Sequence, residues 1–93
     1  MDEEGYVRFL ESQGLSLNGI NTRKSKANDV MDIIGKDLDA IVADDEEMYR
    51  AIIELQKVDD PAHTPGQNAL RKYYAFRNGK EFPRVADYER TRK

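Results

Sequence analysis

The sequence predicts an all-α fold, a small bundle of four or five helices in a chain of 93 residues. Apolar residues recur at helical spacing in four separate segments, and no run of alternating β-branched residues indicates a sheet. Glycines that suit helix ends follow three of these segments, at Gly14, Gly35 and Gly79. Because the chain has no Gly/Ser-rich linker, we expect one helical domain in residues 1–83 and a charged C-terminal tail in residues 84–93.

The first helix is expected at about residues 2–13. Tyr6 and Leu10 share one face, and acidic residues open the segment, where the helix dipole favours negative charge. Gly14 suits a left-handed cap, and Ser16 is a good N-cap for the next helix. The first two helices should therefore meet at a tight corner.

The second helix is expected at about residues 17–34, with Ile20, Ala27 and Val30 along its apolar stripe. Polar residues interrupt that stripe for more than one turn, at residues 23–26. The interruption has two interpretations, which are that this turn is exposed on a functional face or that the helix frays there.

Leu38 and Ile41 then indicate a short connector that is anchored in the core. A third helix is expected at about residues 45–57, with apolar residues facing inward and acidic residues at its start. Turn residues mark a loop at 58–66, and the fourth helix follows at about residues 67–78. Phe82 and Pro83 are expected to pack against the bundle.

Composition excludes several classes of function. Without cysteine the chain has no disulfide, no thiolate nucleophile and no Cys-based zinc site, and His63 is the only histidine. No motif for a phosphate loop, a hydrolase or a calcium site is present, so we expect no cofactor, no metal and no enzymatic activity. An acidic start and the lack of a long apolar run favour a cytoplasmic protein without a membrane segment.

Charge is distributed unevenly along the chain. Residues 1–62 carry seven Lys/Arg against fifteen Asp/Glu, a net of −8, whereas residues 63–93 carry eight against three, a net of +5. A basic segment on an acidic body is one indication of a nucleic-acid surface. It is also compatible with a small domain that is simply well solvated.

Three segments resemble the core-binding domain of tyrosine recombinases and phage integrases. They are Phe9-Leu10 with Gly14-Leu15-Ser16, the segment 34–38, and the Ala-Leu-Arg-Lys-Tyr-Tyr-Ala-Phe helix at 69–76. The resemblance covers about residues 4–83 and implies a SAM-like orthogonal bundle that grips double-stranded DNA without performing chemistry. In that family the nucleophilic tyrosine lies in a separate catalytic domain, so Tyr73 and Tyr74 are expected to be packing residues.

The resemblance also implies which residues contact DNA, because the family lays its second and fourth helices across the duplex. The candidates are Arg23, Lys24 and Lys26 on the second helix and Gln67, Asn68, Arg71 and Lys72 on the fourth. The predicted function is a non-catalytic DNA-binding module of an integrase-like, recombinase-like or nuclease-associated protein. Such a module would bind DNA weakly alone and act with a catalytic domain or protein partner.

An alternative is a protein-interaction module from a phage or mobile element that regulates or inhibits a nucleic-acid enzyme. The acidic surface from Asp37 to Asp60 would then occupy the basic DNA channel of that enzyme. This alternative predicts that charge reversal at residues 44–47 abolishes the activity and leaves the fold intact.

Overall fold

The chain folds into six helices around one apolar core, and the computed structural model describes residues 1–60 and 63–91. No strand occurs among these residues, which confirms the all-α prediction. The helices are α1 (Glu3–Ser12), α2 (Leu17–Ile34), α3 (Leu38–Val42), α4 (Asp45–Gln56), α5 (Pro65–Asn78) and α6 (Val85–Thr91). Two of them lie outside the four main predicted helices, since the connector and much of the expected tail are helical.

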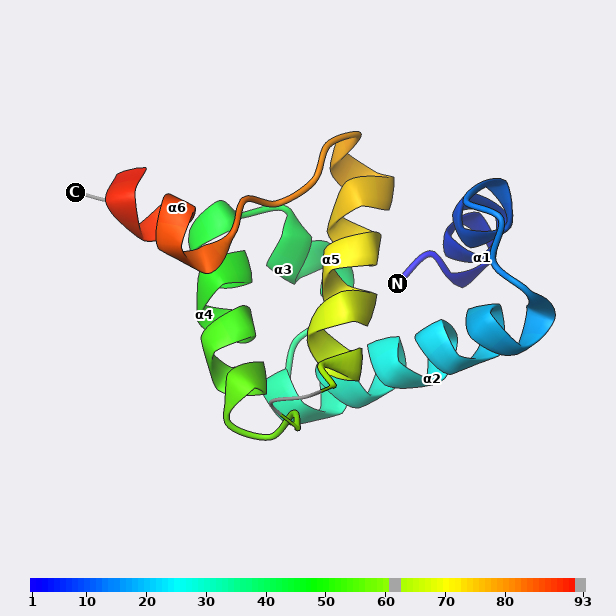
Figure 1. Cartoon of the computed structure of the whole chain (residues 1–93), viewed down its shortest axis with the longest axis horizontal. Helices are drawn as coiled ribbons and strands as arrows, with labels where there is room; N and C mark the ends of the chain where they lie inside the picture. The colour runs from blue at the N-terminus through cyan, green and yellow to red at the C-terminus, as the bar shows by residue number, and fades with distance from the viewer. Residues whose placement is uncertain (61–62, 92–93) are drawn as a thin grey trace.

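α5 crosses α2 at the centre of the bundle, and these two helices share the most extensive contact in the fold (Figure 1). α4 lies on one side of α5, α1 lies on the other side near the start of α2, and α3 packs between α4 and α5 (Figure 1). The fully buried large side chains come from all five of these helices. They are Tyr6, Leu10, Val30, Leu38, Ile41, Met48, Ile52, Leu55, Leu70, Tyr73 and Tyr74.

The helix ends follow the local signals in the sequence. Gly14, Gly35 and Gly79 all adopt left-handed backbone conformations, with φ of 81°, 79° and 71°. Ser16 caps α2 by accepting a hydrogen bond from the Gly19 N–H at 3.2 Å. α2 is continuous through residues 23–26, so the helix does not fray there. In this polar turn Ser25 is exposed, while Arg23, Lys24 and Lys26 are half-buried.

α5 begins two residues before its predicted start. Pro65 occupies the first turn, where its missing N–H has no intrahelical acceptor to lose and its fixed φ suits a helix. The predicted loop therefore ends at Thr64, and residues 61 and 62 of that loop lie outside the described residues.

α1 is held against α5 at very short range. The Tyr6 hydroxyl donates a buried hydrogen bond to the Ala69 carbonyl at 2.9 Å. Gly5 lies against the Phe76 ring, because a Cβ atom there would meet the Asp2 carboxylate and come within 2.6 Å of that ring. A larger residue at this position would force these side chains to move.

Tyr73 and Tyr74 join α5 to neighbouring elements, and both are buried, as the sequence predicted. The Tyr73 hydroxyl donates to Asp39 Oδ1 at 2.5 Å and accepts from the Asp2 N–H at 2.9 Å. The Tyr74 hydroxyl donates to Asp45 Oδ1 at 2.8 Å. The two hydroxyls therefore hold α5 against α3, α4 and the residue that precedes α1.

Residues 85–91 of the expected charged tail form a helix, α6. The Tyr88 ring packs between Tyr49 at 5.3 Å and Phe82 at 5.2 Å, measured between ring centroids. This aromatic contact supplies apolar burial that the charged local sequence does not indicate. Residues 92 and 93 of the expected tail lie outside the described residues.

Replacement of Gly5 by alanine is expected to destabilise the fold by about 1–3 kcal/mol, because the new methyl group overpacks the α1–α5 contact. Gly19→Ala is the matched control in α2, where a Cβ would make only ordinary contacts at 3.5 Å or more. It should be neutral or stabilise by up to about 1 kcal/mol, because alanine favours helix. Urea denaturation measures both effects, and equal effects of the two substitutions would contradict the close approach at Gly5.

High pH is expected to destabilise the bundle through Tyr73 and Tyr74. Burial and the hydrogen bonds to Asp39 and Asp45 raise the pKa of each tyrosine from 10.0 to about 12. Because the folded-state pKa exceeds the unfolded value, the stabilisation is complete below pH 10 and is lost as pH rises from 10 to 12. The free energy of unfolding in urea should therefore fall across this range.

A variant with Tyr73→Phe and Tyr74→Phe provides the control. Its stability at neutral pH should be lower, and its loss of stability above pH 10 should be shallower than that of the wild type. Burial also raises the pKa of Tyr6, so the variant should still lose some stability at high pH. If the free energy of unfolding falls equally steeply with pH in both proteins, other groups cause the alkaline unfolding.

Candidate nucleic-acid interface

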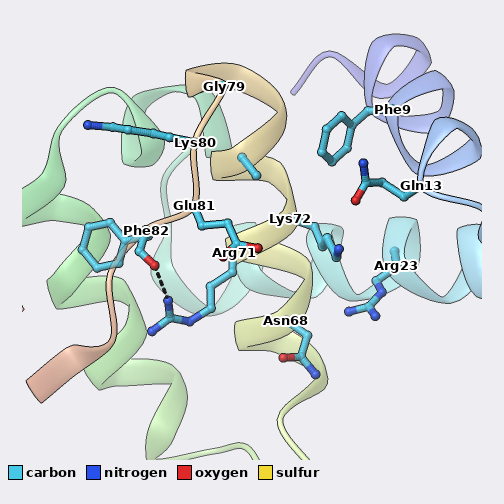
Figure 2. Close-up of a pocket in the computed structure, with 11 residues that line it drawn as sticks. Phe9, Gln13, Arg23, Asn68, Arg71, Lys72, Gly79, Lys80, Glu81 and Phe82 are labelled. Atoms are coloured by element: carbon cyan, nitrogen blue, oxygen red, sulfur yellow. Dashed lines mark hydrogen bonds between the residues drawn. The ribbon is translucent and has the colours of Figure 1, made fainter. Parts of the chain in front are cut away.

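An open groove of about 580 Å³ lies between α1, α2, α5 and the segment that follows α5 (Figure 2). Its lining residues are Phe9 and Gln13 from the end of α1, Arg23 from α2, Asn68, Arg71, Lys72 and Ala75 from α5, and Gly79, Lys80, Glu81 and Phe82 after α5. A second hollow of about 540 Å³ adjoins it between the first half of α2 and the start of α5. Arg23 and Asn68 line both hollows, which together we call the cationic groove.

The cationic groove has a charge opposite in sign to that of the whole chain. Five Lys or Arg side chains line it against one carboxylate, a net of +4, whereas the chain carries −3. Within the described part of the chain, Arg23, Lys72 and Lys80 form no ion pair, and Lys26 has an exposed partner, Asp29, at 3.7 Å. These cations are therefore available to an anionic ligand.

The groove gathers five of the seven side chains that the sequence singled out. They are Arg23, Lys26, Asn68, Arg71 and Lys72. Figure 2 shows four of them, Arg23, Asn68, Arg71 and Lys72, on one side of the crossing of α2 and α5. Lys26 lines the adjoining hollow.

Lys24 and Gln67 are not brought to the groove. Lys24 lines a separate shallow hollow against α1, because one step along a helix turns the side chain by about 100° from Arg23. Gln67 is held by Asp59, whose Oδ2 accepts from the Gln67 backbone N–H at 3.1 Å and from its side-chain amide at 3.2 Å. Gln67 therefore anchors the start of α5 to the preceding loop.

Arg71 lines the groove but also has a structural role that the sequence did not indicate. Its Nη1 donates to the Phe82 carbonyl at 3.0 Å (Figure 2) and also to the Pro83 carbonyl at 3.1 Å. The guanidinium lies 5.8 Å from the centre of the Phe82 ring, and burial lowers its pKa. Arg71 thus fastens the segment after α5, which is one wall of the groove.

The groove is also lined by Phe9, Gln13 and Lys80, none of which was among the predicted contacts. Phe9 and Gln13 come from the end of α1, and Lys80 follows the stop at Gly79. The basic character of residues 63–93 was a signal for Lys80, whereas the positions of Phe9 and Gln13 depend on how α1 is placed.

The acidic residues at 44–47 contribute to the fold. Asp44 caps α4 by accepting from the backbone N–H of Glu46 at 2.8 Å, and Asp45 accepts from Tyr74. Glu46 accepts from the Tyr88 hydroxyl at 3.2 Å, and Glu47 pairs with Lys36 at 2.7 Å. Charge reversal at residues 44–47 would break these four contacts, so we expect it to lower the stability of the fold.

The described residues include neither a metal-binding cluster nor a helix suited to a membrane. Within residues 1–60 and 63–91, no group of three or more His, Cys, Asp or Glu side chains is arranged to hold a metal ion. Over the same ranges, no helix combines the length and apolar character that crossing a membrane requires.

Comparisons of the chain with protein-family models, with curated proteins and with solved structures gave no match. The resemblance to the recombinase core-binding domain thus stays a prediction from the three sequence segments. The chemistry of the cationic groove has to be inferred from its own side chains.

Arg71→Ala is expected to lower the free energy of unfolding by about 1–2 kcal/mol, because two backbone carbonyls lose a charged donor. Amide exchange in α6 should accelerate more than exchange in α2. Lys72→Ala, one position along the same helix, is the control and should change stability by less than about 0.5 kcal/mol. If both variants lose the same stability, the anchoring role of Arg71 is rejected.

Proposed function

We propose that this chain is a non-catalytic DNA-binding module and that its cationic groove receives the sugar-phosphate backbone. The observation that supports this function is the gathering of five cationic side chains at one groove of an otherwise acidic chain. Lys and Arg contacts to phosphates supply most of the affinity in non-specific DNA binding. Asn68 and Gln13 add amide groups that could bond to phosphates or base edges.

The proposed affinity is low for the module alone. Five cations supply only a small number of phosphate contacts. Acidic side chains on the rest of the surface also oppose the approach of a polyanion. We expect dissociation constants on the order of micromolar or weaker at physiological salt. The module would therefore act beside a catalytic domain or protein partner, in an integrase-like, recombinase-like or nuclease-associated assembly, which agrees with the sequence resemblance.

Salt dependence tests the role of the groove cations. Arg23→Gln and Lys72→Gln should each weaken binding to a generic duplex several-fold at low salt. Each should also reduce the slope of log K against log salt by about 1, because one phosphate contact is lost. Fluorescence anisotropy at several salt concentrations measures both quantities.

Lys57→Gln is the matched control, because Lys57 follows α4 outside the groove and carries the same charge. It should leave the slope unchanged. A wild-type protein that shows no salt-sensitive binding at low ionic strength would refute DNA binding. Equal losses for Lys57→Gln and Lys72→Gln would show that overall charge, and not the groove, governs the interaction.

A further inference from the structure

We propose, on the basis of the DNA binding proposed above, that the α1 end of the cationic groove receives an unpaired base. The module would then bind DNA that carries a single-stranded end or flap more tightly than continuous duplex. Three features at this end of the groove support the proposal: an aromatic wall, a carboxamide beside it, and two cations in the same hollow.

The aromatic wall is the ring of Phe9. Phe9 is only half-buried, and its ring centre lies 5.7 Å from that of Phe76, which supports it from the α5 side. Figure 2 shows the ring pointing from α1 into the space between α1 and α5. An aromatic ring that lines a hollow of about 580 Å³ can stack on a nucleobase, which is a common way to bind single strands.

The carboxamide belongs to Gln13. Its side chain is exposed and lies beside the Phe9 ring in the same hollow (Figure 2). A carboxamide offers donors and an acceptor together, so it matches the mixed edge of a base better than it matches a phosphate. Phe9 and Gln13 thus provide a face contact and an edge contact for one planar group.

The cations are Arg23 and Lys72, which reach into the hollow from α2 and α5 (Figure 2). They would hold the phosphates on either side of the inserted base. A cationic groove that follows the backbone, combined with an aromatic platform, is the arrangement found in proteins that bind single strands.

Continuous duplex cannot use the aromatic wall. In a duplex each base has its faces covered by its neighbours, so that only base edges and phosphates are accessible. Stacking on Phe9 requires a base that is already unpaired or has left the helix, and an end or a flap supplies such a base at little cost. The stacking energy therefore adds only to the binding of DNA with a free base.

The test compares three ligands by fluorescence anisotropy at low salt: a blunt duplex, the same duplex with a short thymidine overhang, and that duplex with an overhang of abasic sites. We expect the thymidine overhang to bind about tenfold more tightly than the blunt duplex. The abasic overhang keeps the phosphates and lacks the bases, so it should bind like the blunt duplex after correction for its added charge. An abasic overhang that binds as tightly as the thymidine overhang would overturn the proposal.

Phe9→Leu keeps an apolar side chain against Phe76 and removes the stacking surface. It should abolish the preference for the thymidine overhang, so that overhang and blunt duplex bind this variant with equal affinity after correction for the added charge. Gln13→Ala changes an exposed residue and provides a second variant that does not depend on core packing; it should reduce the preference several-fold. Thermal melting by circular dichroism confirms that both variants are folded.

The outcomes separate this inference from the DNA binding on which it rests. If all three ligands bind equally and Lys72→Gln weakens all of them, the groove binds DNA but takes no unpaired base. If no ligand binds, the proposed function itself fails. If Phe9→Leu weakens blunt and overhang ligands by the same factor, Phe9 only shapes the groove, and the base site is rejected.

Discussion

α5 crosses α2 at the centre of the bundle, and its polar groups bond to the surrounding elements. The Ala69 carbonyl accepts a hydrogen bond from the Tyr6 hydroxyl of α1. Tyr73 and Tyr74 donate hydrogen bonds to the carboxylates of Asp39 in α3 and Asp45 in α4. Apolar burial stabilises the contacts between these helices but is non-directional. The hydroxyl bonds each require one position, so they set the register of the helices around α5.

The same helix uses its other side for the groove. Arg71 and Lys72 lie between the buried Leu70 and Tyr73 in the sequence. Their side chains therefore lie on the side of α5 that lines the groove. Both residues are half-buried, but Arg71 is bonded to backbone carbonyls, whereas Lys72 forms no ion pair with the described residues. These adjacent residues of like charge thus have different roles, because only Arg71 donates hydrogen bonds to the segment 79–83.

The sequence predicted most of the helices because their signals are local. α2 has the predicted bounds, and the glycine stops lie where the helices end. α6 could not be predicted in this way, since the partners of Tyr88 lie at Tyr49 and Phe82, in other elements. The groove was partly predictable: helical spacing placed Arg23 and Lys72 outside the core, but only the tertiary arrangement shows that Lys24 faces α1 and that Phe9 faces a hollow.

The use of carboxylates as hydrogen-bond acceptors has a consequence for the electric field of the molecule. Asp39 and Asp45 are fixed on α3 and α4 by tyrosine hydroxyls, and α4 lies on the far side of α5 from α1 (Figure 1). The Asp45 carboxylate is thus held on α4, whereas the Asp39 carboxylate is balanced by Arg77 and by the N-terminal amine. If the groove binds DNA as proposed, a carboxylate held in place outside the groove would disfavour approach of the polyanion from that side.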